Sequence, residues 1–334
     1  MRALRVHEHG SPVDVLRLEE VDVPIPPAGR ALLRVDAAAL NLPDVLLCHG
    51  TYAMKPDFPF TPGLDAGGVI ESVGDGVDPS IIGRRVATVA DLPNGSLAEF
   101  AIVKPDGLFD VPIDIDLGEA VSAQIIFQTA HLALHHRGRI RKGETVLILG
   151  AAGGVGTAAI QLAVLAGARV IAVVGGAEKL SMAKTLGATV TIDHTDLSGT
   201  TLSEAVLAAT NGRGVDVVVD PVGGDAFDQA RRCIAVDGRL LVVGFAGGDT
   251  QRVNAGVVLR GSFDVVGVYV GAYSKTIEGR ALLASIHQEL MGLLRSGAIR
   301  PVIDRAIGLD EVADAMTDLA ARRIVGKVLV YPTR

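Results

Sequence analysis

The segment VLILGAAGGVGTAAIQLA, residues 146–163, predicts a buried strand, a glycine-rich turn and a helix, in that order. The turn resembles the dinucleotide-binding pattern G-x-G-x-x-G, with alanine at the first position and with Gly153 and Gly156 at the other two. Small residues let the backbone approach a pyrophosphate, and the start of a helix attracts negative charge. The simpler alternative is a tight turn that binds nothing. Because strand, turn and helix occur together, we favour phosphate binding by Gly153, Gly154 and Val155.

Outward from this segment, short apolar runs alternate with amphipathic stretches. Strands are predicted over residues 145–150, 169–175, 189–192, 215–220, 238–245 and 263–270. Helices are predicted between them over residues 157–167, 177–188, 202–211 and 226–235. Strands that alternate with crossover helices indicate a doubly wound parallel sheet of the Rossmann type, which is an α/β fold. The nearly continuous apolar strands agree with a sheet covered on both faces.

The first ~120 residues have a different rhythm. Strand-like runs occupy residues 1–10, 31–41, 67–74 and 84–90, and prolines cluster between them. We interpret this part as a barrel-like, mainly antiparallel β domain. The C-terminal part contains a long helix over 274–297, a shorter helix over 310–321 and a closing strand over 326–332. These elements are too few for a domain of their own, so we expect them to complete the first one.

The composition excludes several classes of function. Of the 334 residues, 49% are hydrophobic and the net charge is −7, which argues against nucleic acid as a partner. The two cysteines, Cys48 and Cys233, build no disulfide framework and no zinc-type CxxC pair. The N-terminus lacks a signal-peptide core, and no stretch predicts a membrane span. We expect a soluble protein with no membrane partner and take the cytoplasm as the default location.

The second predicted strand bears on the choice of cofactor. An NAD site usually has an acid at the end of this strand, but here the strand ends with Val174, Gly175 and Gly176. A missing carboxylate removes repulsion of a 2′-phosphate, and Lys179 is available to pair with it. The alternative is that Lys179 is an ordinary solvated residue. We favour NADPH as the cofactor, with Gly175 and Lys179 in contact with it.

Seven further segments, together with the glycine turn, resemble one family. They are LNLPDVLLCHGTY, FPFTPGLDAGGVIESVG, GSLAEFAIV, EKLSMAKTLGA, DVVVDPVGGD, LLVVGFAGG and IVGKVLVYP. In this order and spacing they resemble the zinc-free, zeta-crystallin-like quinone oxidoreductases of the medium-chain dehydrogenase/reductase superfamily. The resemblance implies a GroES-like catalytic domain, residues 1–123 and 269–334, around a Rossmann NADPH-binding domain, residues 124–268. It also implies a homodimer, often joined through the edge of the Rossmann sheet.

The same comparison argues against a metal. Zinc alcohol dehydrogenases place Cys where this chain has Asn41, and Gly-His-Glu where it has Gly63, Leu64 and Asp65. Catalytic zinc needs about three protein ligands, and neither Asn41 nor Leu64 is one. Without a Lewis acid, a quinone or enone is the better hydride acceptor than an isolated ketone, because its negative charge becomes delocalised. We therefore expect a conjugated carbonyl substrate and no metal.

The resemblance places Asn41, Asp44 and Tyr52 near the nicotinamide and the substrate. Tyr52 is a candidate hydrogen-bond donor to the developing enolate, or else a packed loop aromatic. Asn41 and Asp44 are candidate catalytic residues, and Asn41 is also a candidate cofactor ligand. The alternative is that Asn41 and Asp44 only hold their loop through turn-type hydrogen bonds.

Further cofactor contacts come from the resemblance alone. Thr129 matches a position beside the nicotinamide, unless it is a helix N-cap. Arg322 is placed near the 2′-phosphate, although Arg323 is an equal candidate. His194 stands where many relatives have Tyr, and its imidazole is a candidate to stack on the adenine or to bond the phosphate. The remaining predicted contacts follow the last two strands of the sheet and are Gly244, Phe245, Ala246, Gly247, Tyr269, Val270 and Gly271.

Two other functions remain open on the sequence. The same fold serves reductases of enoyl thioesters such as 2-enoyl-CoA, and a basic rim for the CoA phosphates would distinguish them. A non-catalytic NADPH-binding protein would keep the fold without turnover. The natural substrate and the number of electrons transferred do not follow from the residues.

Overall fold

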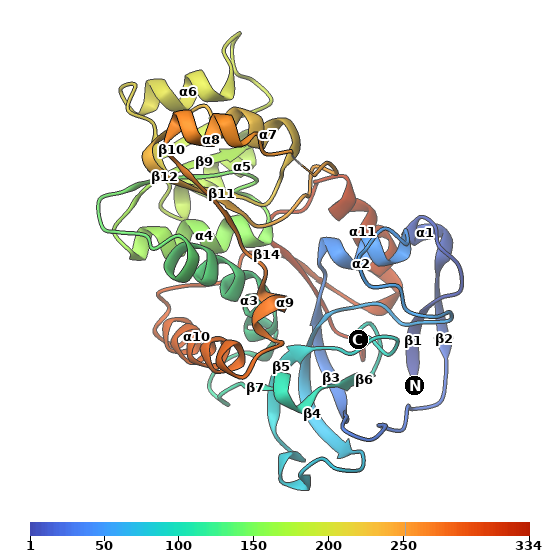
Figure 1. Cartoon of the computed structure of the whole chain (residues 1–334). Coiled ribbons are helices and arrows are strands. Elements are labelled where there is room, and N and C mark those ends of the chain that lie inside the picture. Colours follow the sequence, from blue (N-terminus) through green and yellow to red (C-terminus); the bar gives the residue numbers. More distant parts are fainter. Residues whose placement is uncertain (251) are drawn as a thin grey trace. The chain divides into compact units, whose positions relative to one another are not determined.

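The computed structural model describes residues 1–250 and 252–334, and the chain divides into two compact units. Unit 1 comprises Met1–Ile125 and Ser274–Arg334, and unit 2 comprises Ile126–Tyr273. The chain passes from unit 1 to unit 2 within helix α3 (Leu117–His131), so both termini belong to unit 1 (Figure 1). The assignment of catalysis to one unit and cofactor binding to the other stays a prediction.

Unit 2 contains a six-stranded sheet in which every neighbouring pair is parallel. Its strands are β8 (Thr145–Ile148), β9 (Arg169–Val174), β10 (Val190–Asp193), β11 (Val215–Asp220), β12 (Ile234–Val242) and β13 (Asp264–Gly267). They lie in the order β10-β9-β8-β11-β12-β13, so the direction of winding reverses between β8 and β11. The predicted doubly wound parallel sheet is confirmed, and its reversal point is where such sheets bind ligands.

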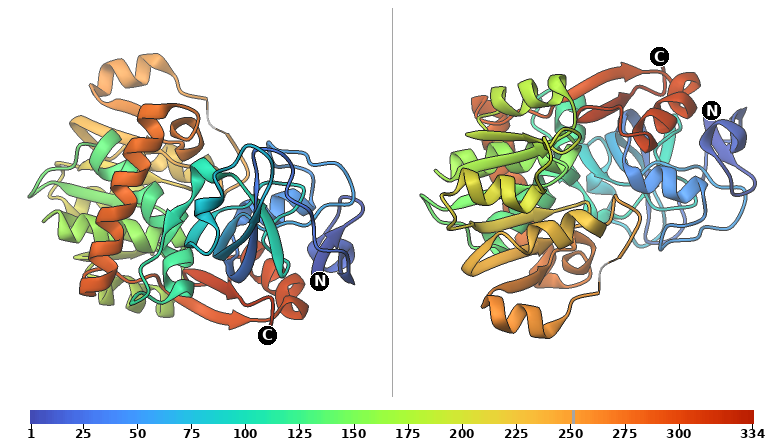
Figure 2. Two further views of the ribbon diagram at one scale, coloured as in Figure 1. Left: turned by 90° about the horizontal axis from the view of Figure 1, so that it is seen from below. Right: turned by 90° about the horizontal axis from the view of Figure 1, so that it is seen from above.

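Helices connect consecutive strands of this sheet. They are α4 (Gly154–Leu165), α5 (Ala177–Thr185), α6 (Leu202–Ala209), α7 (Gly224–Ala230) and α8 (Ala255–Gly261). Figure 2 shows helices along both faces of the sheet, as right-handed crossovers in both directions require. Leu147, Ile171, Val218 and Leu240 of the strands are 0% exposed and form a core with Phe227 of α7. Val146, Val170 and Val219, which alternate with these residues and face the other side of the sheet, are also 0% exposed, which explains why the strands are apolar on both faces.

Two local predictions for unit 2 were wrong. The helix predicted over 226–235 ends at Ala230, because Ile234 already pairs with Val215 as the start of β12. The strand predicted over 263–270 ends at Gly267, and Val270 begins a short helix, α9 (Val270–Tyr273). In both places tertiary strand pairing sets the boundary, and local propensity does not.

Unit 1 contains a seven-stranded, mainly antiparallel sheet and a two-stranded hairpin. The sheet order is β14-β15-β3-β4-β5-β7, with β6 also paired to β3. The hairpin is β1 (Arg2–Val6) with β2 (Leu16–Glu20). The sheet strands are β3 (Ala31–Ala39), β4 (Asp65–Val73), β5 (Arg85–Val89), β6 (Phe100–Val103), β7 (Phe109–Asp110), β14 (Ile303–Ile307) and β15 (Lys327–Val330). The predicted mainly β fold of this part is confirmed.

The C-terminal elements complete the unit 1 sheet. β15 pairs antiparallel with β3, with Leu329 opposite Ala39. Helix α11 (Val312–Ala320) buries Val312 and Met316 in the same core as Phe60 and Leu33. The longest helix, α10 (Ile277–Ser296), begins at a Thr276 N-cap and ends at Gly297, which has a φ of 73°. Among the described residues, none of the helices combines the length and apolar character that crossing a bilayer requires.

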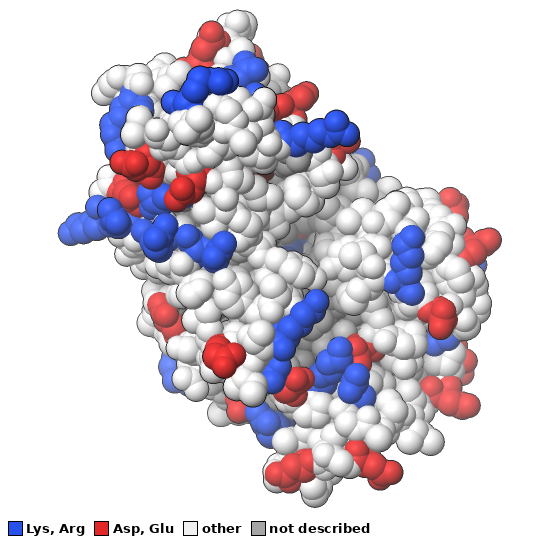
Figure 3. All heavy atoms as spheres, in the orientation of Figure 1, with Lys and Arg blue, Asp and Glu red and all other residues white. Residues whose placement is uncertain are grey.

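Charges of both signs mix on the surface. On the described part of the face drawn in Figure 3, lysines and arginines are interspersed with aspartates and glutamates. A protein that tracks a nucleic-acid backbone needs a basic stripe instead. The face in Figure 3 offers none.

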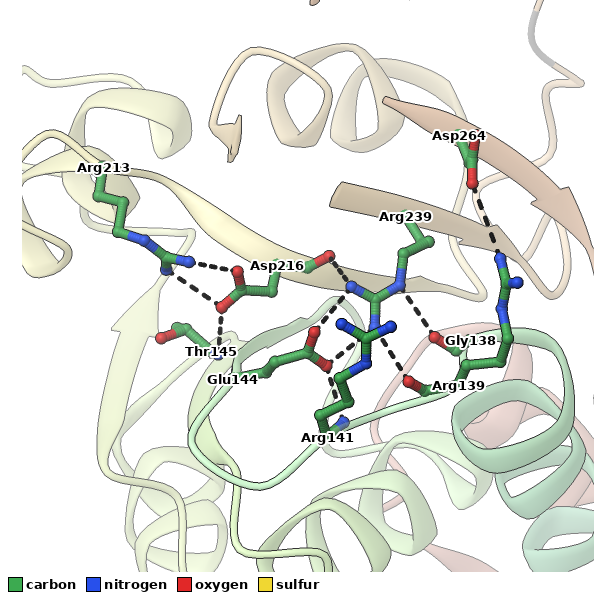
Figure 4. A network of polar contacts seen from close by, with 9 residues as sticks. All are labelled: Gly138, Arg139, Arg141, Glu144, Thr145, Arg213, Asp216, Arg239 and Asp264. Carbon is green, nitrogen blue, oxygen red and sulfur yellow. Dashed lines mark hydrogen bonds and ion pairs between the residues drawn. The ribbon is translucent and has the colours of Figure 1, made fainter. Parts of the chain in front are cut away.

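A buried arginine joins three segments at the amino-terminal edge of the unit 2 sheet (Figure 4). Arg239 of β12 is 9% exposed. Its Nε donates to the carbonyl of Gly138 at 2.9 Å, and its Nη2 donates to Glu144 at 2.8 Å. Its Nη1 donates to the carbonyl of Asp216 at 3.3 Å, and the carboxylate of Asp216 pairs in turn with Arg213. The network therefore ties β12 to β11 and to the loop before β8.

We predict that Arg239→Ala destabilises the chain by about 3–5 kcal/mol, because it leaves Glu144 as a half-buried charge without its partner. Urea unfolding measures the loss. The matched control is Arg139→Ala, whose side chain is 71% exposed and lies 4.0 Å from Asp264. That change should cost under about 0.5 kcal/mol. Equal losses in the two variants would contradict the role given to Arg239.

Candidate functional site

The turn after β8 has two glycines with different structural demands. A Cβ added to Gly156 would lie 2.4 Å from the carbonyl oxygen of Gly150 and 2.6 Å from Cα of Ala151, so α4 can pack here only with glycine. A Cβ added to Gly153 would meet only the Gly150 oxygen, at an ordinary 3.4 Å. Gly153 is exposed and immediately precedes α4. The fold therefore requires Gly156, whereas Gly153 leaves the backbone open to a ligand.

The first turn of α4 supplies donors beside this opening. The helix begins at Gly154, and Gly154 and Val155 are half-buried. The first N–H groups of a helix have no acceptor within the helix, and they carry the positive end of its dipole. The turn also lies next to the reversal point between β8 and β11. The structure thus brings Gly153, Gly154 and Val155 together in an arrangement that suits a phosphate.

The ends of β9 and β10 bring two further predicted residues together. A Cβ on Gly175 would lie 3.0 Å from Nε2 of His194, so the imidazole lies directly against the glycine. The backbone N–H of His194 donates to the carbonyl of Val174 at 2.9 Å. Lys179 is the third residue of α5, which starts just beyond Gly175, and it is half-buried. Gly175, Lys179 and His194 therefore occupy one corner of the sheet edge.

An acid that the sequence analysis did not single out lies at the same corner. Asp193 accepts from the hydroxyl of Thr195 at 2.6 Å, from its N–H at 2.9 Å and from the N–H of Gly176 at 3.1 Å. The bonds from Thr195 are the main reason that the pKa of Asp193 lies below its ordinary value. The Asp-x-Thr spacing of an Asx turn was the available signal. This carboxylate joins β10 to the start of α5.

The run after β12 lies along the segment that follows β11. Ala246 donates its N–H to the carbonyl of Pro221 at 3.0 Å, and Gly247 donates to the carbonyl of Val222 at 2.7 Å. A Cβ on Gly247 would come within 2.8 Å of that Val222 oxygen. Phe245 is 44% exposed. The small residues of the predicted run from Gly244 to Gly247 thus allow close backbone approach.

A buried carboxylate holds the turn after β11. Asp220 is 0% exposed, and its Oδ1 accepts from the N–H groups of Val222 and Gly223, both at 2.8 Å. Its Oδ2 has no hydrogen-bond partner among the described residues. Burial raises the pKa of Asp220. The sequence analysis treated Asp220 only as part of a matching segment, although an acid closing an apolar strand calls for buried donors.

Four predicted cofactor contacts lie elsewhere in unit 2. Tyr269 is 66% exposed, and its ring lies against Gly271, where a Cβ would be 2.6 Å from Cζ. Val270 and Gly271 form the first turn of α9. Thr129 lies near the end of α3 and is half-buried, so its alternative role as an N-cap was wrong. Its proximity to a cofactor stays a prediction.

In unit 1, Asp44 joins two segments. It lies in the first turn of α2 (Leu42–Cys48) and is 0% exposed. Its Oδ2 accepts from the N–H of Asn41 at 2.7 Å, and its Oδ1 accepts from the N–H of Leu64 at 3.1 Å. Burial raises the pKa of Asp44 to about 7, and the nearby charge of Asp65 adds to this effect. Asp44 thus performs the loop-holding role that its sequence left open.

The Asn41 side chain is held by two buried charges. Its Nδ2 donates to Asp65 Oδ2 at 2.9 Å and to the carbonyl of Ala39 at 3.2 Å. Its Oδ1 accepts from Lys327 Nζ at 2.7 Å, and the same ammonium donates to Asp65 Oδ2 at 2.9 Å. Asp65 is 1% exposed and Lys327 is 3% exposed. Both N–H bonds of the amide are therefore used, and its oxygen retains one lone pair as an acceptor.

Sequence reasoning missed Asp65 and Lys327 as site residues. Lys327 was quoted only within a matching segment, and Asp65 only there and in the argument against zinc, although each is a charge beside an apolar strand. Charged residues inside buried strands are rarely tolerated unless they are paired. That rule identifies two candidates. It does not identify their partners, because Asp65 and Lys327 are 262 positions apart.

The other predicted residues of unit 1 are more exposed. Tyr52 is half-buried after α2, where it packs against the core and donates its N–H to the carbonyl of Leu46 at 3.2 Å. Arg322 is exposed and has a φ of 59°. Arg323 pairs with Asp318, with Nη2 and Oδ1 2.7 Å apart. Its guanidinium is thus engaged by an acid, and the choice between Arg322 and Arg323 as the phosphate contact stays a prediction.

Comparison with curated proteins identifies the family. The chain is 34% identical to the quinone oxidoreductase-like protein 2 homolog of Nematostella vectensis, over 89% of this chain and 80% of that protein. It is 32% identical to the quinone oxidoreductase of Rattus norvegicus, over 96% of this chain and 94% of that protein. The chain belongs to the quinone oxidoreductase family. It is thus an oxidoreductase of the medium-chain dehydrogenase/reductase superfamily.

Family models and solved structures agree with this membership. Residues 27–113 match the alcohol dehydrogenase GroES-like domain, and residues 154–285 match the domain described as zinc-binding dehydrogenase. The quinone oxidoreductase of Escherichia coli, solved in complex with NADPH, superposes with a TM-score of 0.90 at 28% identity. That comparison covers 99% of this chain and 100% of the other. The predicted Rossmann and GroES-like folds are confirmed.

We predict that Gly156→Ala destabilises this family member by about 1–3 kcal/mol, because α4 has to shift away from the β8 turn. The matched control is Gly153→Ala, because Gly153 has a φ of −78° and an added Cβ would meet only the Gly150 oxygen, at 3.4 Å. That change should alter the free energy of unfolding by less than about 1 kcal/mol. Urea unfolding measures both. A larger loss at residue 153 than at residue 156 would contradict the packing argument.

Asp44 predicts a pH dependence of stability. Its pKa rises from an ordinary 3.8 to about 7 on folding, so in this window the folded chain holds a proton that the unfolded chain releases. The contribution of Asp44 to stability therefore falls as pH rises through the window. In Asp44→Asn this fall is absent. The free energy of unfolding of the variant therefore rises relative to that of the wild type, by on the order of a few kcal/mol, between about pH 5 and about pH 8.

Urea unfolding at several pH values checks this. The control is Asp78→Asn, because the pKa of Asp78 lies below its ordinary value and it does not titrate in this window. Its curve should run parallel to that of the wild type. If the Asp44→Asn curve were also parallel, the raised pKa would be refuted.

Proposed function

We propose that this chain transfers a hydride from NADPH to a quinone or another α,β-unsaturated carbonyl, without zinc. The observation that carries the proposal is the turn after β8, which is closed by packing at Gly156 and open at Gly153. It lies where a doubly wound sheet binds dinucleotides. The Escherichia coli relative solved with NADPH supports the choice of cofactor.

The residues that would hold NADPH follow the strands of unit 2. Gly153, Gly154 and Val155 would take the pyrophosphate with backbone N–H groups. The remaining cofactor residues that we propose are Asn41, Thr129, Gly175, Lys179, His194, Gly244, Phe245, Ala246, Gly247, Tyr269, Val270, Gly271 and Arg322. Bound NADPH supplies the hydride. The chain supplies binding, orientation and the exclusion of water.

The proposed preference for NADPH over NADH rests on the residues around Gly175 at the ends of β9 and β10. No acid ends β9, so no carboxylate is placed to bond both ribose hydroxyls there. Asp193 is close by, but its oxygens already accept from backbone and hydroxyl groups. Lys179 is the cation on α5 that we propose to pair with the 2′-phosphate.

A catalytic zinc does not fit the residues present. Zinc relatives would need ligands at Asn41 and Leu64, and Leu64 is a buried apolar side chain. The oxygens of Asn41 and Asp65 both face the ammonium of Lys327, which already supplies a positive charge at that point. Among the described residues, no group of three or more His, Cys, Asp or Glu side chains is arranged to hold a metal. We therefore propose that the description of the matched domain as zinc-binding does not carry over to this chain.

The substrate class follows from this chemistry. Hydride addition to a conjugated carbonyl spreads the negative charge over several atoms, so a neutral hydrogen-bond donor is enough to stabilise it. Tyr52 is the donor that we propose, since a phenol can donate without ionising. Asn41 and Asp44 are the other proposed catalytic-site residues, with Asp44 acting by holding the backbone of Asn41. Hydride addition to an isolated ketone would concentrate the negative charge on one oxygen, which would need a stronger stabilising group than a neutral hydrogen-bond donor.

We further propose a cytoplasmic homodimer. β13 is one of the two edge strands of the unit 2 sheet, and among the described residues it pairs only with β12. An open parallel edge is suited to pairing with a second copy. No nucleic-acid or membrane partner is part of the proposal.

The test is NADPH binding followed by turnover. Fluorescence titration should show NADPH binding more tightly than NADH, and NADPH consumption should appear with benzoquinone or cyclohexenone. Lys179→Ala should weaken NADPH about tenfold or more and leave NADH unchanged, because it removes a charge-assisted bond to the 2′-phosphate. Lys184→Ala, at the far end of α5, is the matched control and should change neither affinity.

Several outcomes would contradict the proposal. Absence of turnover with quinones and enones, together with turnover of crotonyl-CoA, would assign the chain to the enoyl-thioester reductases. NADPH binding without turnover of any acceptor would make it a binding protein. Equal weakening of NADPH and NADH in Lys179→Ala would remove the phosphate contact. If Tyr52→Phe left turnover unchanged, Tyr52 would have only a packing role and would not be the hydrogen-bond donor.

A further inference from the structure

Two buried charges meet over the end of strand β3. β3 lies between β15 and β4 in the unit 1 sheet. Lys327 is the first residue of β15 and Asp65 is the first residue of β4, so one charge comes from each neighbouring strand. They pair at 2.9 Å, and both bind the side chain of Asn41, which lies two residues beyond the end of β3. The ion pair therefore holds Asn41, which is the first residue after β3 that has a polar side chain.

The pair fixes which way the Asn41 amide points. An ammonium can only donate and an ionised carboxylate can only accept. The amide oxygen must therefore face Lys327, and the amide nitrogen must face Asp65. A flipped amide would set N–H against ammonium and oxygen against carboxylate. A neutral pair of residues would not impose this choice.

The orientation restricts what Asn41 can bind. Its two N–H bonds are used by Asp65 and by the carbonyl of Ala39, and its oxygen already accepts from Lys327. The one remaining position is a lone pair on Oδ1. Asn41 can thus accept one hydrogen bond from a ligand and can donate none. On the nicotinamide riboside of NADPH, the ribose hydroxyls and the carboxamide N–H are donors of the required kind.

Stability alone does not account for the pair. Replacing a buried ion pair by apolar residues of similar volume is often neutral or stabilising, whereas breaking it by removing one partner is costly. In some proteins such buried polar groups instead impose a specific geometry. Here the geometry that the ion pair imposes is the orientation of the Asn41 side-chain amide.

We infer that Asp65 and Lys327 are positioning residues, whose ion pair orients the Asn41 amide to accept a hydrogen bond from the nicotinamide riboside of NADPH. The inference rests on the proposed function, because it takes NADPH as the ligand. Neither residue needs to touch the cofactor.

The experiment removes both charges together. Asp65→Asn combined with Lys327→Met removes both members of the ion pair, so neither leaves the other as an unpaired buried charge, and this variant should fold where Lys327→Met alone would leave Asp65 unpaired. Binding is measured for NADPH and for 2′-phospho-AMP, which lacks the nicotinamide riboside. We expect NADPH to bind about three- to tenfold more weakly, the range for one hydrogen bond, and 2′-phospho-AMP to change by less than about twofold. A merely structural effect would weaken both ligands alike.

Asn41→Ala tests whether the pair acts through Asn41. If it does, adding Asp65→Asn and Lys327→Met to Asn41→Ala should cause no further loss of NADPH affinity, because the oriented group is already gone. Additive losses would overturn the inference. The stability control is Val330→Ala on the same strand β15, a fully buried residue outside this network. It should lower the melting temperature and leave both affinities unchanged.

Binding separates this inference from the proposed reaction. A wild-type chain that binds NADPH but reduces no acceptor would refute the reaction, and the affinities would still decide the role of the pair. Unchanged NADPH affinity in the double variant would refute the positioning role of the ion pair and leave the proposed reaction unaffected. If the wild-type chain bound 2′-phospho-AMP as tightly as NADPH, the nicotinamide riboside would form no favourable contact. That result would also refute the positioning role of the ion pair.

Discussion

Helix α4 can begin where it does only because residue 156 has no side chain. The carbonyl oxygen of Gly150 occupies the space that a Cβ would take, and this contact fixes the distance between α4 and β8. The same closeness places the first turn of the helix directly after the exposed Gly153. One packing constraint therefore builds both the hydrophobic layer of unit 2 and the turn that we propose to bind the pyrophosphate. A wider helix–strand spacing would lose both at once.

Unit 1 obeys a complementary constraint, which is that buried charge must find partners. Asp44, Asp65 and Lys327 are each at most 3% exposed. Their partners are backbone N–H groups, one amide and each other, and the two carboxylates outnumber the single ammonium. Burial and this imbalance raise the pKa of Asp44 to about 7. The cost of the network falls on one carboxyl group, while the Asn41 amide gains a fixed orientation.

The pattern of apolar runs was enough to predict both folds, because strands buried on two faces and strands buried on one face differ in sequence. It was not enough to place every boundary. Helix-favouring residues continue past Ala230, yet pairing of Ile234 with Val215 turns the chain into a strand. Helix α8 was missed, since its start depends on an Asn254 cap that accepts from Gly256 and its seven residues carry no clear period.

The candidate site divides in the same way. Glycines in a strand–turn–helix context are a local signal, so the turn at Gly153 was predictable. The pairing of Asp65 with Lys327 is not local, because the two residues meet only after β15 and β4 have both joined β3. Asn41 was found through its family resemblance, but its use as an acceptor alone follows from which atoms face it. Sequence can thus name a polar residue at a site, whereas only the assembled sheet decides whether that residue donates or accepts.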